Sequence, residues 1–325
     1  MYQPIKSIDA HVHLTSILFA QDIFQPKENV LDGDCVKACL ARMEKHGIDQ
    51  CLAIAAQGIS ILPLENHMLI KMAELLPEKI AGAMVGFSTP REDPSSYDPE
   101  AAAEEIAGYM KNPVVKGFGE IALEGIGGMH EWPEVWAKLR PTFEVLAKHN
   151  APALFHTGAS PHFGMPSEKR PISNRPLYFG NPALLDDIAE EFPEVPIIIG
   201  HAGVQGFYFY GSYPDMALTV AARHPNVYIE TSSVPYDVLL KAVDCPAIGP
   251  EKLIFGTDSP AFYGYYKSGI TGEFYPTYGD GVPGDIMTDH YPVDIANINR
   301  LPITDRERQM IMGGTIAKLM AAKHE

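Results

Sequence analysis

The chain has 325 residues, of which 46% are hydrophobic and 20% charged, and its formal net charge is −16. This length allows a large core, and α/β barrels of similar length form one domain, so we expect a single domain over residues 1–325. The acidic balance argues against a nucleic-acid partner, because phosphate recognition needs a basic surface. No apolar stretch approaches the roughly 20 residues needed to cross a bilayer.

These features predict a protein that acts on a small molecule, without a membrane or nucleic-acid partner. The N-terminus shows no signal peptide, so a cytoplasmic location is expected. Four scattered cysteines are too few for a disulfide framework, which predicts reduced thiols. The sequence leaves open whether the chain forms a homo-oligomer.

Strand and helix patterns alternate along the chain. Short apolar runs predict eight strands, at 5–14, 51–55, 80–87, 114–121, 153–156, 196–201, 227–231 and 253–258. Helical patterns lie at 34–46, 66–76, 99–110, 134–149, 182–192, 215–224, 235–243 and 305–320. Eight such units with nearly continuous apolar strands predict an α/β fold, a (β/α)8 TIM barrel. The alternative, an open doubly wound sheet, lacks its Gly-rich phosphate turn after the first strand.

Two long stretches interrupt this alternation, 160–180 after strand five and 259–301 after strand eight. We predict both as long loops that cover the mouth of the barrel. Loops of this length are functional or disordered, and the aromatic content of the second favours order.

Six polar side chains stand at the ends of the predicted strands. They are His11, His13, Glu120, His156, His201 and Asp258. Side chains alternate along a strand, so His11 and His13 point to the same side. Active sites of such barrels lie at the carboxyl ends of the strands, which would bring all six together. Imidazoles and carboxylates suit one or two divalent transition metal ions, zinc first, with manganese, iron or nickel as alternatives.

The remaining histidines divide into two groups. His46, His149 and His224 end predicted helices, where a cation suits the helix dipole. His67 is expected on a helix face and His324 in a frayed tail. His130 lies in a loop after strand four, from which it could also reach the substrate. Candidates for substrate binding in the two long loops are His162, His290, Arg170 and Arg175. Arginine can hold a carboxylate by two parallel hydrogen bonds, which predicts a carboxylated substrate.

The motifs occur in a characteristic order, with D-x-H-x-H at 9–13, FHTG at 155–158, GHAG at 200–203, VYIETS at 227–232 and FGTDSP at 255–260. Taken together, they resemble the amidohydrolase superfamily, and more closely its amidohydrolase-related branch of TIM-barrel metal-dependent hydrolases and decarboxylases. The resemblance implies His11, His13 and Asp258 as metal ligands. It implies His156 as a ligand or as facing a second metal, and His201 as a ligand or a substrate-polarising group.

The chain departs from these relatives at two places. Many carry a carboxylated lysine on strand four, whereas VVKGFGEIAL places Lys116 and Glu120 on the same side of the strand. GEIAL resembles a segment of TatD-type deoxyribonucleases in which the glutamate is a metal ligand, so we favour Glu120. Lys116 remains a carboxylated ligand, a substrate contact or a partner of Glu120. The second departure is the last helix, where relatives have G-N-A and this chain has residues 314–316 as Gly-Thr-Ile.

The sequence predicts hydrolysis of a lactone, amide or ester by a metal-activated water. Asp258 would accept the proton of the water, and His201 would help to polarise the carbonyl group. The alternative is a lyase that decarboxylates or hydrates an aromatic or unsaturated acid. Decarboxylating relatives generally manage without a ligand from strand four, so Glu120 favours hydrolysis. A third alternative, a barrel that binds metal or ligand without turnover, would need a gap in the ligand set.

Overall fold

The computed structural model describes residues 5–15, 28–55, 63–87, 97–121, 131–158, 180–205, 213–259, 263–267, 274–278 and 291–323. Eight parallel strands lie side by side in chain order. They are β1 (Ile8–Val12), β2 (Gln50–Ile54), β3 (Ile80–Val85), β4 (Val115–Ile121), β5 (Ala153–Gly158), β6 (Ile197–Gln205), β7 (Val227–Glu230) and β8 (Leu253–Ile254). Backbone hydrogen bonds from Ala10 to Phe255 and from His13 to Ser259 join the ends. The predicted (β/α)8 barrel is confirmed.

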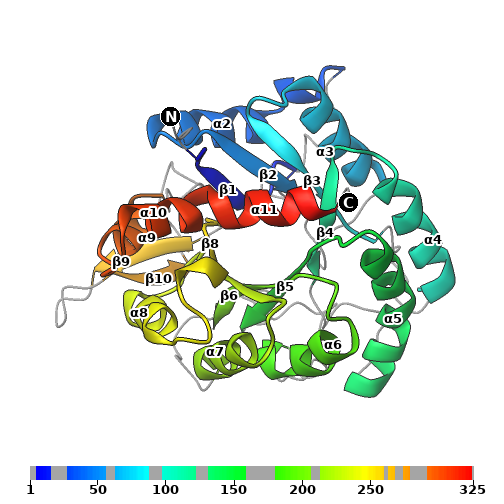
Figure 1. The fold of residues 1–325 in the computed structure, drawn as a ribbon. Coiled ribbons are helices and arrows are strands. Elements are labelled where there is room, and N and C mark those ends of the chain that lie inside the picture. Colours follow the sequence, from blue (N-terminus) through cyan, green and yellow to red (C-terminus); the bar gives the residue numbers. More distant parts are fainter. Residues whose placement is uncertain are drawn as a thin grey trace, which may run out of the picture.

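Helices surround the strands, as Figure 1 shows. They are α2 (Asp34–Lys45), α3 (Pro63–Leu75), α4 (Pro99–Met110), α5 (Trp132–Lys148), α6 (Leu185–Glu191), α7 (Tyr213–Arg223) and α8 (Tyr236–Asp244). Local signals account for their starts. The Asp98 side chain caps α4 by accepting two backbone N–H groups, and Pro99 occupies the first helical position. No helix in the described ranges is long and apolar enough to cross a membrane.

The predicted loop 259–301 contains regular structure, so that prediction is wrong for part of its length. Two antiparallel strands, β9 (Tyr263–Lys267) and β10 (Phe274–Tyr278), pair with each other, and α9 (Tyr291–Asn299) follows. Aromatic residues favour strands, and this local preference accounts for the pair. Helix α9 buries Tyr291 and Ile298. The predicted loop 160–180 lies outside the described residues, except for Gly180.

The predicted helix 305–320 is divided into two parts. A capping box of Thr304 and Glu307 starts α10 (Asp305–Gln309), a wider π turn (Met310–Gly314) follows, and α11 (Thr315–Ala322) ends the segment. A Cβ atom on Gly313 would lie 2.0 Å from the Lys6 carbonyl oxygen. Glycine at this position therefore lets the turn pass directly against the start of β1.

Helix α11 crosses the amino-terminal end of the barrel (Figure 1). Its final turn is followed by Lys323, whose ammonium group donates to the carbonyl oxygens of Asn112 and Val115 near the start of β4. The apolar interior is formed by Ile8, Ala10, Leu52, Ile54, Met84, Leu154, Ile198 and Ile254 from the strands, with Ile316, Leu319 and Met320 from α11. One end of the barrel is thus sealed by packing, and the other end carries the polar side chains.

We expect Ile316→Ala to lower the free energy of unfolding by about 2–5 kcal/mol, because it removes a fully buried side chain from this seal. Chemical denaturation measures the change. The control is Leu75→Ala on α3, whose side chain is 45% exposed, so a change within about 0.5 kcal/mol is expected. Equal effects of the two substitutions would contradict a sealing role for α11.

Candidate metal centre

The fold brings together all six side chains predicted from the strand ends. They come from β1 and the residue that follows it, from β4, β5 and β6, and from the segment after β8, and all are buried. Their potential ligand atoms form two groups within which all atoms lie at most 4.8 Å apart. One group is His11, His13, Glu120 and Asp258, and the other is Glu120, His156 and His201. Glu120 therefore belongs to both groups.

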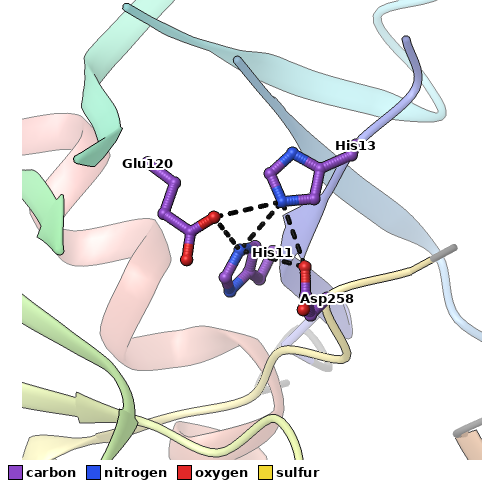
Figure 2. Close-up of side chains that lie close together, drawn as sticks. All are labelled: His11, His13, Glu120 and Asp258. Atoms are coloured by element: carbon purple, nitrogen blue, oxygen red, sulfur yellow. Dashed lines mark hydrogen bonds and ion pairs between the residues drawn. The ribbon is translucent and has the colours of Figure 1, made fainter. Parts of the chain in front are cut away.

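The spacing of the first group fits a tetrahedral ion. The Nε2 atoms of His11 and His13 are 3.2 Å apart, and Asp258 Oδ1 lies 3.5 and 3.0 Å from them. Glu120 Oε2 lies 3.6 and 3.4 Å from the same two nitrogens (Figure 2). Four zinc ligands with bonds of about 2.0–2.2 Å stand about 3.3 Å from one another. These residues therefore fit a divalent transition metal.

The second oxygen of Glu120 faces the second group. Oε1 lies 2.8 Å from Nδ1 of His156 and 3.3 Å from Nε2 of His201. One carboxylate thus lies between two sets of possible ligands, an arrangement compatible with one ion or with two.

Lys116 lies outside this cluster. It stands four residues before Glu120, or about 13 Å along the strand at the usual rise per residue. Its Cγ is 2.3 Å from where a Gly82 Cβ would lie. Burial, and after it the charge of Lys116, lower the pKa of Lys323, the residue that follows α11. Burial lowers the pKa of Lys116 itself. Lys116 thus lies near the sealed end of the barrel, and the three roles left open by the sequence stay predictions.

Two of the six side chains are presented by unusual backbone. His201 has a φ of 62° and Asp258 a φ of 54°, the left-handed region that residues other than glycine rarely adopt. Such strain persists where surrounding contacts enforce it, and it clusters at functional sites. The backbone N–H of His201 donates to the buried carboxylate of Glu230, at 3.2 Å.

Charges within the cluster support each other. Burial alone would lower the pKa of His11 and His13, but nearby Glu120 and Asp258 outweigh it and raise the pKa of His13 to about 10 and that of His11 well above its usual value. Conversely, burial would raise the pKa of Glu120, and the charges of His156 and His11 hold it well below the usual range. The same balance lowers the pKa of Asp258 to about 2. Without a metal ion, protonated imidazoles and ionised carboxylates therefore stabilise each other in the cluster.

A buried carboxylate behind the cluster had no role in the sequence prediction. Asp9, the first letter of D-x-H-x-H, accepts hydrogen bonds from the hydroxyls of Thr257 and Tyr291, both at 2.6 Å. It also accepts the backbone N–H groups of His11 and Thr257, both at 3.1 Å. Asp9 therefore ties β1 to the residue before Asp258 and to α9. The sequence signal was the motif itself, but its partner Tyr291 is far away in the chain.

The remaining histidines and the candidates for substrate binding do not belong to the described cluster. His46 and His149 cap α2 and α5, and His224 follows α7 and contacts Asp186 at 2.7 Å, in agreement with their assignment to helix ends. The candidates for substrate binding lie outside the described residues. They are Arg170, Arg175, His162 and His290. His130 also lies outside the described residues. Their roles stay predictions.

Known proteins place the fold and site in context. The amidohydrolase family profile matches residues 8–320, and the chain belongs to this family. No curated protein sequence matches it. The structure of 5-carboxyvanillate decarboxylase from Sphingomonas paucimobilis is similar, with a TM-score of 0.60, 15% identity and coverage of 98% of this chain and 99% of that one.

Two further known structures are similar to this chain. An amidohydrolase from Burkholderia multivorans with bound zinc has a TM-score of 0.59 and 15% identity, over 97% of this chain and 99% of that one. A probable 2-pyrone-4,6-dicarboxylic acid hydrolase from Acinetobacter baumannii, with citric acid bound, has a TM-score of 0.55 and 13% identity, over 97% and 99%. The chain is thus an amidohydrolase-family barrel with a site for a divalent metal. At these identities, the structural likeness shows the fold alone.

We expect His11→Ala and His13→Ala each to lower occupancy by a divalent transition metal sharply, because each removes one of the closely spaced nitrogens. Elemental analysis of the purified protein measures it. His67→Ala, an exposed position on α3, is the control and should keep the metal. Full retention in the His11→Ala, His13→Ala double variant would contradict the site.

Zinc binding should release protons at pH 7, because the raised pKa values of His11 and His13 keep these imidazoles protonated in the metal-free protein. The affinity should fall as the pH falls, by about tenfold per pH unit for each proton displaced. Calorimetric titration in buffers of different ionisation enthalpy counts the protons. If the heat of titration does not depend on the buffer, the imidazoles are already deprotonated before zinc binds, and the prediction is wrong.

Proposed function

We propose that the protein is a metal-dependent hydrolase of a small lactone, amide or ester that carries a carboxylate. The observation that carries this proposal is the position of Glu120, with one oxygen toward each group of ligand atoms. A further ligand from β4 is what the hydrolytic interpretation requires. We propose His11, His13, Glu120, His156, His201 and Asp258 as the residues that hold the metal.

Zinc is the ion that we propose, with manganese as the alternative. The donor set of imidazoles and carboxylates supports it, as does the tetrahedral spacing of the first group. When bound, the metal supplies Lewis acidity, which makes water nucleophilic near neutral pH and polarises a carbonyl oxygen.

We assign the proton transfer to Asp258. As an ionised carboxylate, it can accept a proton. Its Oδ1 faces His11 and His13, while its Oδ2 lies 3.9 Å from His201 Nε2. A proton accepted by the Asp258 carboxylate can be passed on to the leaving group. His201 Nε2 lies 3.3 Å from Glu120 Oε1. As the alternative to binding the metal, this nitrogen would donate a hydrogen bond to the carbonyl oxygen under attack.

The carboxylate on the substrate follows from Arg170 and Arg175, which we propose as its binding residues, together with His162 and His290. The likeness to a probable hydrolase of a pyrone dicarboxylic acid is compatible with such a substrate. The second candidate function is a lyase acting on an aromatic or unsaturated acid. The likeness to 5-carboxyvanillate decarboxylase favours it.

Glu120→Gln separates the two functions. In a hydrolase, we expect it to reduce metal content or hydrolysis by orders of magnitude, at 1.36 kcal/mol of transition-state free energy per factor of ten. The experiment measures metal per chain and turnover on a panel of carboxylated lactones, amides, esters and aromatic acids. Glu191→Gln, which alters a surface carboxylate paired with Arg140, is the matched control and should change neither.

Asp258→Asn should abolish most turnover on the same substrate, because an amide cannot accept the proton. Release of carbon dioxide from an aromatic acid, with one metal per chain both before and after Glu120→Gln, would establish the lyase instead.

A further inference from the structure

A second carboxylate, Glu230, lies behind the cluster rather than in it. It ends β7 and is fully buried. Its Oε2 lies 3.3 Å from Nδ1 of His11, and it also accepts the backbone N–H of His201 and the hydroxyl of Ser232, at 3.2 and 2.9 Å. Its Oε1 accepts the backbone N–H of Ser232 at 2.6 Å. Every one of these contacts presents a donor to Glu230.

Ser232 extends this arrangement to a second histidine. Its Oγ lies 2.7 Å from Nδ1 of His201. A hydroxyl has one proton to donate, and Ser232 directs it to Glu230, so the same oxygen accepts from Nδ1–H of His201. Glu230 thus receives an Nδ1–H directly from His11 and, through Ser232, determines which nitrogen of His201 carries its proton.

The consequence concerns the opposite nitrogens. When such a ring binds a metal as the neutral imidazole, Nδ1 keeps its proton and the lone pair on Nε2 is the ligand. Nε2 of His11 is the atom 3.2 Å from His13 Nε2, in the first ligand group, and Nε2 of His201 is the atom 3.3 Å from Glu120, in the second group. His13 is oriented separately, because its Nδ1 lies 3.1 Å from the carbonyl oxygen of Ile54.

The absence of a side chain at Gly256 leaves room for the Glu230 carboxylate. A Cβ atom on Gly256 would lie 2.2 Å from Glu230 Oε1 and 2.9 Å from the Cβ of His11. The glycine of the FGTD motif therefore allows Glu230 and His11 to meet beside the end of β8.

We propose that Glu230 is a positioning residue that sets the tautomers of His11 and, through Ser232, of His201, and so prepares one histidine in each ligand group to bind metal. This inference rests on the proposed function in so far as both histidines are taken as ligands. Carboxylates that orient metal-binding histidines typically change metal affinity 10- to 100-fold when they are replaced.

Glu230→Gln tests the proposal with little change in shape. Either orientation of the amide sets its NH2 group against a donor, the Ser232 backbone N–H on one side or the His11, His201 and Ser232 donors on the other. We expect zinc affinity, measured on the metal-free protein by competition with a chelator, to fall by about 10- to 100-fold. Asp186→Asn is the matched control, because it alters a histidine–carboxylate pair with His224 away from the cluster.

A second measurement separates positioning from general damage to the fold. In zinc-loaded protein labelled with 15N in histidine, Glu230→Gln should alter the imidazole signals of His11 and His201 and leave those of His13 unchanged. Ser232→Ala should alter His201 and leave His11 unchanged, which provides a test if Glu230→Gln does not fold.

The outcomes distinguish this inference from the proposed function. If wild-type protein binds zinc but both variants bind it as the Asp186→Asn control does, Glu230 has no positioning role. Equal changes in the signals of His11, His13 and His201 would also overturn the inference. If the wild-type protein itself binds no zinc, the metal centre of the proposed function fails, and with it the basis of this inference.

Discussion

The buried carboxylate of Glu120 lies within 3.6 Å of nitrogens from four imidazoles, those of His11, His13, His156 and His201. A buried negative charge is costly unless opposite charges and hydrogen bonds compensate for it. Here the compensation comes from three other strands. The carboxyl end of the barrel therefore depends on the convergence of β1, β5 and β6 on the end of β4, and a cation or protons must complete the balance.

Two further carboxylates support this convergence from behind. Asp9 joins β1 to Thr257 and to Tyr291 of α9, while Glu230 joins β7 to His11 and to the turn at His201. Each accepts several hydrogen-bond donors, which is how a buried carboxylate is accommodated. The positive φ values at His201 and Asp258 fit the same picture, because the network holds strained backbone in place.

The two ends of the barrel have different physical tasks. At the amino-terminal end, Ile316, Leu319 and Met320 of α11 fill the interior with apolar contacts. At the carboxyl end, the interior is polar and the ligand atoms face one another. This separation lets the packing energy of the core hold closely spaced charged groups in position, which is where a rigid scaffold contributes to metal binding and catalysis.

The class of fold and the six converging side chains could be predicted from the sequence, because both follow from local patterns. Alternating strand and helix signals predict the barrel, and period-two alternation together with position at strand ends predicts the cluster. Boundaries of helices 34–46 and 99–110 were also close to those of α2 and α4.

The division of the six side chains into two groups around Glu120, and the residues that stand behind them, could be found only in the three-dimensional structure. Glu230 is 219 positions from His11, and Tyr291 is 282 positions from Asp9, so no local pattern links either pair. The break at Gly313 likewise depends on the approach of Lys6, a contact from the opposite end of the chain. Hydrogen bonds and close packing between distant segments are set by the three-dimensional path of the backbone, and local propensity carries no information about them.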